Sequence, residues 1–116
     1  MKKIYKSIKV IIILFSIISF ELGAQALSGT VTINSGQATG GTNYQTFSVL
    51  ATALNSNGVN GPLVINVAPN SGPYVDQIQL NTIPGASAVN AITINGNNNV
   101  LSWTSNTSSA PWTIGL

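Results

Sequence analysis

The chain has 116 residues, four basic side chains, two acidic ones, and neither His nor Cys. All four cations lie within the first nine residues, and the two carboxylates are Glu21 and Asp76. This distribution excludes a polybasic nucleic-acid site in the body of the chain, a transition-metal site built from His or Cys, and any disulfide.

The first 26 residues have the pattern of a secretory signal peptide. A basic segment, 1–9, precedes an apolar run, 10–20, and a short polar stretch then ends in Ala24-Gln25-Ala26. Small residues at Ala24 and Ala26 fit the cleft of signal peptidase. A membrane anchor is the alternative interpretation, but the apolar run is shorter than the roughly 20 residues that span a bilayer. We therefore predict cleavage after Ala26 and export.

Removal of this segment leaves residues 27–116, in which Asp76 is the one charged side chain. Asn, Thr, Ser and Gly make up half of these residues. Disordered segments combine low hydrophobicity with high charge, whereas here charge is nearly absent and short apolar runs recur. The composition therefore favours one small β domain. Because residues 27–116 contain no cation, nucleic acid is excluded as a partner and a basic membrane-binding patch is excluded as well.

The first predicted elements are a strand, a loop and a helix. Residues 29–34 alternate Val and Ile with Thr, which predicts a strand, and a Gly-rich loop follows at 35–43. Apolar residues then recur at helical spacing, with Thr46 as the expected N-cap and Gly58 just past the C-terminal end. The apolar positions of this helix are Phe47, Leu50, Ala51 and Leu54.

Everything after Gly61 is typical of short strands separated by polar turns. We expect strands at 62–68, 74–80, 91–95, 100–104 and 112–116. The first is largely apolar, which indicates a strand buried on both sides or stacked inside a solenoid. The second places Tyr74, Asp76, Ile78 and Leu80 on one face.

Short strands at this spacing fit a sandwich, a barrel or a β-solenoid, and three features favour the solenoid. The apolar runs lack clear hairpin alternation, Asn-rich turns can ladder between stacked coils, and a single helix stands where it can cover an open end. The predicted fold is all-β, the start of a right-handed parallel β-helix with an N-terminal strand and one short capping α-helix. The residues expected to form its core are Phe47, Leu50, Leu54, Val64, Ile65, Val67, Ile78, Leu80, Ile92 and Ile94.

A series of short motifs runs in order through nearly all of residues 27–116. They are Ser28-Gly29-Thr30, Ala53-Leu54-Asn55, Gly58-Val59, Gly61-Pro62, Asn66-Val67-Ala68-Pro69, Tyr74, Gln77 and Ile83-Pro84-Gly85-Ala86-Ser87-Ala88. This series resembles the N-terminal portion of large secreted, pectin-lyase-like β-helix proteins that Gram-negative bacteria export by the type IX route. The chain departs from that pattern at Gly72-Pro73 and at Asp76.

The resemblance implies three segments: the signal peptide at 1–26, the strand, loop and capping helix at 27–61, and the first β-helix coils at 62–116. The later coils and the C-terminal sorting domain of that group do not follow in this sequence. We therefore expect an N-terminal fragment, truncated within its coils.

The sequence offers no catalytic constellation beyond residue 26. Glycoside hydrolysis normally needs two carboxylates, and no His, Lys or Cys is present there to activate a serine or threonine. We predict no catalytic residue, no cofactor and no metal site. A calcium site at Asp76 is the alternative, but one carboxylate rarely holds the ion, and a solvated or turn-stabilising role is the simpler interpretation.

Three aromatic residues are candidates to stack on sugar rings: Tyr74, Trp103 and Trp112. The commoner role of large aromatic side chains is to fill or flank a core, and this remains the alternative for each of them.

The expected function is structural: a capping and nucleating segment of a secreted or cell-surface β-helix protein whose full form acts in adhesion or glycan contact. Its expected partners are further β-helix coils and extracellular glycan. Two alternatives stay open. One is the N-terminal part of a polysaccharide lyase or hydrolase whose catalytic coils lie beyond residue 116, and the other is a small solenoid that self-associates through its open C-terminal end. A product without a sorting domain would stay in the periplasm.

Overall fold

The computed structural model describes residues 24–104 and 114–115. Within these ranges the chain is mostly β, with one helix, and every pairing between named strands is parallel. The elements are β1 (Leu27–Ile33), β2 (Asn43–Tyr44), α2 (Phe47–Asn57), β3 (Val59–Val67), β4 (Tyr74–Val75), β5 (Ile78–Gln79), β6 (Ile92–Asn95), β7 (Leu101–Ser102) and β8 (Ile114–Gly115).

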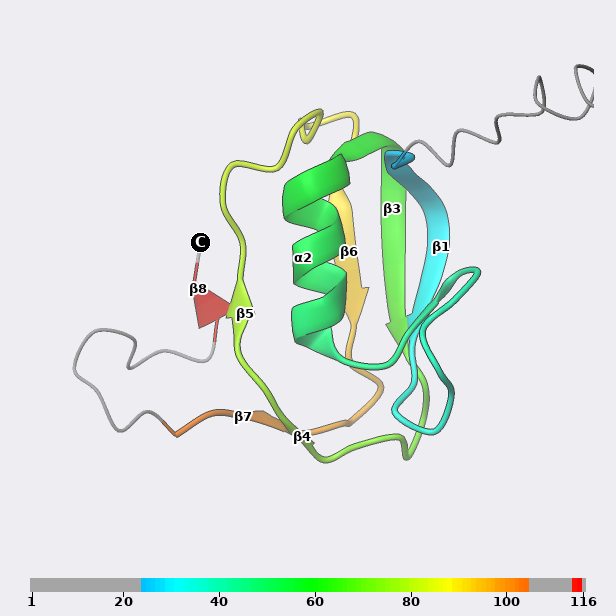
Figure 1. The fold of residues 1–116 in the computed structure, drawn as a ribbon, viewed down its shortest axis with the longest axis vertical. Coiled ribbons are helices and arrows are strands. Elements are labelled where there is room, and N and C mark those ends of the chain that lie inside the picture. The colour runs from blue at the N-terminus through cyan, green and yellow to red at the C-terminus, as the bar shows by residue number, and fades with distance from the viewer. Residues whose placement is uncertain (1–23, 105–113, 116) are drawn as a thin grey trace, which may run out of the picture.

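The largest sheet has the strand order β2-β1-β3-β6, and α2 packs on one face of it (Figure 1). In its register, Val31 of β1 lies opposite Ile65 of β3, and Ile65 lies opposite Ile94 of β6. Residues paired in a parallel register point to the same side of the sheet. The three side chains therefore form one row on the face that α2 covers.

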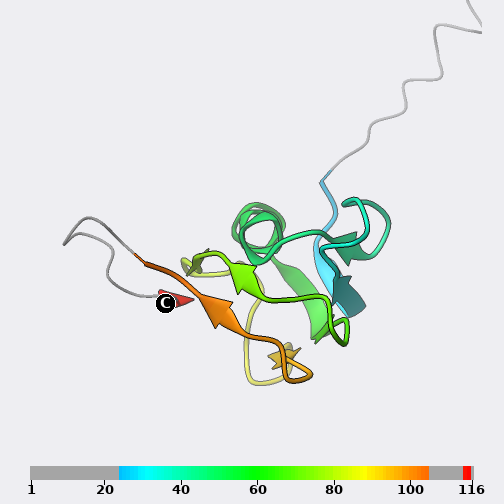
Figure 2. The same cartoon turned by 90° about the horizontal axis from the view of Figure 1, so that it is seen from below.

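Two further parallel pairs join β4 to β7 and β5 to β8. The strands β3, β4 and β5 thus follow one another along the chain, and β6, β7 and β8 pair with them in the same order. Figure 2 shows the orange strand β7 running beside the yellow-green strand β4. We call the segment from β3 to β5 the first passage of the chain and the segment from β6 to β8 the second. The second passage runs beside the first, in the same direction, at three places.

The core lies between the large sheet, α2 and the segment that carries β4 and β5. In β3, Leu63, Ile65 and Val67 are completely buried, whereas Val64 and Asn66 are partly exposed. Of the two alternatives that the apolar run allows, burial on both sides is not observed, because only one side of the strand is fully covered. The buried apolar residues are Leu27, Val31, Ile33, Phe47, Leu50, Ala51, Leu54, Val59, Leu63, Ile65, Val67, Tyr74 and Ile78.

The ends of α2 are the ones that the sequence predicts. The Thr46 hydroxyl accepts a hydrogen bond from the Val49 amide, which satisfies one of the free N–H groups of the first turn. Gly58 has a positive φ of 68° and donates its N–H to the Leu54 carbonyl. A Cβ at Gly58 would also collide with the Pro84 carbonyl, so both backbone conformation and space require glycine here.

Two of the expected core residues are not core residues in the structure. Val64 is partly exposed on the outer side of β3, and Ile94 is 44% exposed. Ile94 shares the inward-facing row with the fully buried Ile65, so its exposure comes from its position on β6, at the edge of the sheet. Leu80 and Ile92 pack against the core and are partly buried.

The predicted strands differ from the observed ones mainly in length. The expected strand at 74–80 is two short strands, β4 and β5, interrupted at Asp76 and Gln77. Only Leu101–Ser102 and Ile114–Gly115 are strands within the last two predicted ranges, and residues 105–113 and 116 lie outside the described residues.

The predicted signal peptide falls largely outside the described residues, which begin at Ala24. Ala24 is exposed and Ala26 is partly exposed, and β1 begins at Leu27, immediately after the predicted cleavage position. In the part of the chain that the structure describes, no helix is long and apolar enough to cross a membrane.

Candidate functional site

The molecule has an uncovered edge at β6, β7 and β8, which we call the open end. Among the described residues, β6 pairs only with β3, β7 only with β4, and β8 only with β5. Large apolar side chains are exposed there: Ile94 is 44%, Val100 62% and Ile114 53% exposed. An unpaired strand edge with apolar side chains beside it is a template for pairing with another strand.

The open end includes an apolar hollow of about 250 Å³. Its walls come from the core residues Phe47 and Ile78 and from Ile94, Leu101 and Ile114 of the edge strands. The hollow is the place where the core reaches the surface, because no described element lies over the outer side of β6 and β8.

The opposite edge of β5 is covered by α2. The Asn55 side-chain amide donates to the Gln79 carbonyl (2.8 Å), and its carbonyl oxygen accepts the Asn81 N–H (2.9 Å). This is the pair of hydrogen bonds that a neighbouring strand would make with β5. Figure 2 shows the yellow-green segment that carries β4 and β5 between α2 and β7.

Asp76 ties the same segment to the start of α2. Its Oδ2 accepts the Ser48 N–H (2.8 Å), and its Oδ1 accepts the N–H of Gln77 (2.9 Å). Ser48 lies in the first turn of the helix, where backbone N–H groups lack helical partners and the helix dipole favours a negative charge. The one carboxylate after residue 26 therefore serves as a helix-terminal acceptor.

This placement also bears on the calcium alternative. Within residues 24–104 and 114–115, no group of three or more His, Cys, Asp or Glu side chains lies together. Asp76 is the one Asp or Glu side chain among these residues, and both of its oxygens already accept backbone N–H groups. A calcium ion at Asp76 would therefore have to replace these hydrogen bonds.

Asn side chains connect the two passages of the chain at the turns. The Asn95 amide donates to Asn66 Oδ1 (2.8 Å) between register-paired residues of β6 and β3. Asn99 accepts the Gly72 N–H (2.8 Å) and donates to the Ala68 carbonyl (3.0 Å), and Asn97 donates to the Val67 carbonyl (2.7 Å). One Asn-to-Asn contact between neighbouring passages, Asn95 with Asn66, therefore matches the predicted laddering, whereas Asn97 and Asn99 bond to backbone groups instead.

The aromatic candidates for sugar stacking do not lie together as a described group. Tyr74 is 5% exposed, meets Phe47 edge-to-face at 5.1 Å between ring centroids, and hydrogen-bonds Ser71 through its hydroxyl (2.7 Å). With so little of its surface exposed, Tyr74 has the core role that the sequence left open as the alternative to sugar stacking. Trp103 is 39% exposed, and Trp112 lies outside the described residues.

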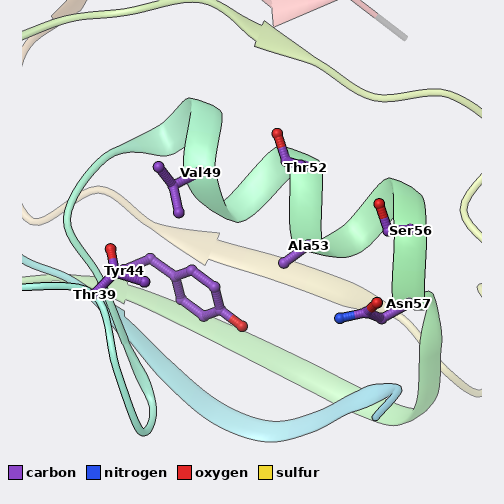
Figure 3. Close-up of a pocket in the computed structure, with 7 residues that line it drawn as sticks. All are labelled: Thr39, Tyr44, Val49, Thr52, Ala53, Ser56 and Asn57. Atoms are coloured by element: carbon purple, nitrogen blue, oxygen red, sulfur yellow. The ribbon is translucent and has the colours of Figure 1, made fainter. Parts of the chain in front are cut away.

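A second concave surface lies on the other side of α2, between the helix and the loop that carries β2 (Figure 3). We call it the outer groove, and it is lined by Thr39, Tyr44, Val49, Thr52, Ala53, Ser56 and Asn57. No motif in the sequence marks Tyr44. It lies two positions before the N-cap Thr46, just outside the position of a hydrophobic staple, which is Gln45 here.

Comparison of the chain with models of protein families, with curated proteins and with solved structures gives no match. The similarity to secreted β-helix proteins therefore depends on the sequence motifs alone.

Proposed function

We propose that this chain forms the capped N-terminal end of a parallel β-helix and provides the surface on which the next coil stacks, in a secreted or cell-surface protein. The observation that carries the proposal is the matched order of the parallel pairs, β3, β4 and β5 beside β6, β7 and β8. A chain that winds in coils produces this order, because each coil repeats the path of the one before it.

The cap is α2. It supplies side-chain hydrogen bonds to the edge of β5 where an earlier coil would supply backbone ones, and it buries Phe47, Leu50 and Leu54 against the first coil. A terminal repeat that covers the core and satisfies the strand edge is what a solenoid needs at its end.

The open end is the growing side. The next coil would pair with β6, β7 and β8 and would cover Ile94 and Ile114, which complete the inward-facing rows begun by Ile65 and Ile78. The expected occupant is a strand-rich coil with apolar residues at matching positions, because the hollow is apolar and the edge carries no charged side chain among its described residues. Adhesion or glycan contact belongs to the complete protein in this proposal.

Extension of the chain by one coil tests the stacking role. A second copy of residues 80–116, which include the loop and strands from β6 to β8, would be joined after Leu116. We expect the β6 amides to exchange hydrogen at least about tenfold more slowly in the extended chain, because ordered strands exchange through rarer openings. A matched control carries Ile92→Asn and Ile94→Asn in the added copy only, and it should leave β6 exchange unchanged. Equal β6 exchange in all three chains would overturn the proposal.

Export is tested separately. We expect the chain expressed with its own N-terminus in a Gram-negative host to be recovered outside the cytoplasm with Leu27 as its first residue. Ala24→Leu and Ala26→Leu, which introduce large side chains at the cleavage site, should block processing. Recovery of the unprocessed chain in the cytoplasm would contradict an exported function.

A further inference from the structure

The outer groove has the size and composition of a small-ligand site. Its volume is about 530 Å³, within the range of roughly 300–1,000 Å³ that is usual for such sites. One wall is the outer face of α2, with Val49 and Ala53, and the other is the partly buried ring of Tyr44 (Figure 3). The outer groove shares no lining residue with the apolar hollow of the open end, so ligand binding there is independent of stacking at β6, β7 and β8.

The polar groups of the groove divide into those already hydrogen-bonded and those that are available. The Thr39 hydroxyl accepts the Gln45 N–H (3.0 Å), and the Thr52 hydroxyl donates to the Ser48 carbonyl (3.0 Å). By contrast, the hydroxyls of Tyr44 and Ser56 and the side-chain amide of Asn57 make no hydrogen bond to any described residue. In Figure 3 the Tyr44 hydroxyl points toward the end of the groove where Asn57 lies.

We propose that the outer groove binds one ring of a neutral saccharide, with an apolar face of the sugar on Tyr44 and its hydroxyls hydrogen-bonded to Ser56 and Asn57. No lining residue is charged, so the groove offers nothing to neutralise an ionic ligand. A purely apolar ligand would cover the Ser56 and Asn57 groups without pairing them, at a cost in desolvation. A sugar ring matches both features, since it has an apolar face and a rim of hydroxyls that donate and accept.

The burial of Tyr44 supports this assignment. Desolvation by burial raises the pKa of its phenol, which agrees with a ring held partly away from water in the wall of the groove. The groove is open along one side, and a ring of about a dozen non-hydrogen atoms in such a site should bind with a millimolar Kd.

The test is an NMR titration of the full chain with three neutral probes: methyl β-D-glucopyranoside, methyl α-D-mannopyranoside and N-acetyl-D-glucosamine. At least one should cause saturable shifts in the amides of Val49, Ala53 and Asn57, and none in those of β6. D-Glucuronate serves as the charged comparison, and it should bind at least about threefold more weakly than the best neutral probe.

Substitutions locate the site. Asn57→Ala and Ser56→Ala should each weaken binding by about two- to tenfold, the effect of one lost hydrogen bond. Tyr44→Phe should keep stacking and lose at most a similar factor, whereas Tyr44→Ala should abolish binding. Val75→Ala, at a side chain that is 76% exposed and outside the groove, is the matched control and should change nothing.

Two results would overturn the proposal. One is the absence of any groove shift with all three neutral probes at concentrations of about 50 mM, far above a millimolar Kd. The other is binding that Asn57→Ala and Ser56→Ala both leave unchanged in folded proteins, which would place the sugar elsewhere. Both variants keep the apolar packing of Tyr44, so the outcome does not depend on whether Tyr44→Ala folds.

Discussion

Asp76 is the one charged residue after position 26, and the structure places it where a negative charge stabilises a helix. Asp76→Asn keeps an acceptor oxygen for the Ser48 N–H but removes the charge, and Asp76→Ala removes both. We expect the free energy of unfolding to fall by about 0.5–1 kcal/mol in the first variant and by about 1–2 kcal/mol in the second. Urea denaturation measures both changes. The loss in Asp76→Asn should shrink in high salt, because salt screens the charge–dipole term; a loss independent of salt would show that the charge has no role.

Tyr44 makes stability depend on pH in the alkaline range. Its pKa is raised above 10.0 by desolvation, so the folded chain holds the phenol proton more tightly than the unfolded chain does. The resulting stability is fully present below about pH 10 and is lost as pH rises through the raised pKa of the folded state. Chemical denaturation of wild type and Tyr44→Phe at about pH 8 and about pH 11 should show a larger alkaline loss in wild type. Equal losses would contradict a desolvated Tyr44.

At the scale of the element, Asn55 decides whether α2 covers the edge of β5. Asn55→Ala leaves the Gln79 carbonyl and the Asn81 N–H without their side-chain partner. Two lost hydrogen bonds cost about 1–3 kcal/mol, more than the gain of about 0.5 kcal/mol in helix propensity, so the variant should be less stable. Hydrogen exchange should speed up at the Asn81 amide. Asn81→Ala is the control, because its backbone N–H remains and its side chain makes no hydrogen bond to a described residue.

Signals within the helix itself predict α2 well. Features that depend on contacts between distant parts of the chain are much harder to predict from the sequence. Thr46 and Gly58 mark the ends of the helix through their own chemistry, and spacing alone identifies its buried face. The largely apolar run in β3 does not show which side faces inward, so the sequence predicts Val64 in the core, whereas the buried residue is Leu63. The outer groove depends on where a Gly-rich loop places Tyr44, which no periodicity in the sequence reports.

At Ile94 the alternation of the sequence predicts the direction of the side chain but not its burial. Its alternation predicts an inward position, and the register confirms the direction, yet the side chain remains 44% exposed. Burial at the end of a stack depends on the next element along the stack, and no property of the residue or of its own strand encodes that neighbour.

At the scale of the whole molecule, near-neutrality and an open end act together. Edge strands in soluble proteins usually carry charged residues that prevent pairing with other chains, and the described residues of β6, β7 and β8 carry none. We therefore expect the purified chain to self-associate as its concentration rises, through β6 and the apolar hollow. Ile94→Lys places a charge at the centre of this surface and should shift sedimentation velocity profiles toward the monomer.

A gain in net charge alone also improves solubility, so the position of the charge has to be separated from its sign. Val89→Lys is the matched variant: it adds the same charge at a side chain that is 80% exposed, in the loop before β6. If the open end drives association, Ile94→Lys should raise the protein concentration at which half of the chains are associated by about tenfold or more. Val89→Lys should raise it by much less, because only Ile94→Lys buries an unpaired charge in the interface. Equal effects of the two lysines would assign the association to low net charge, and the open end would then have no special part in it.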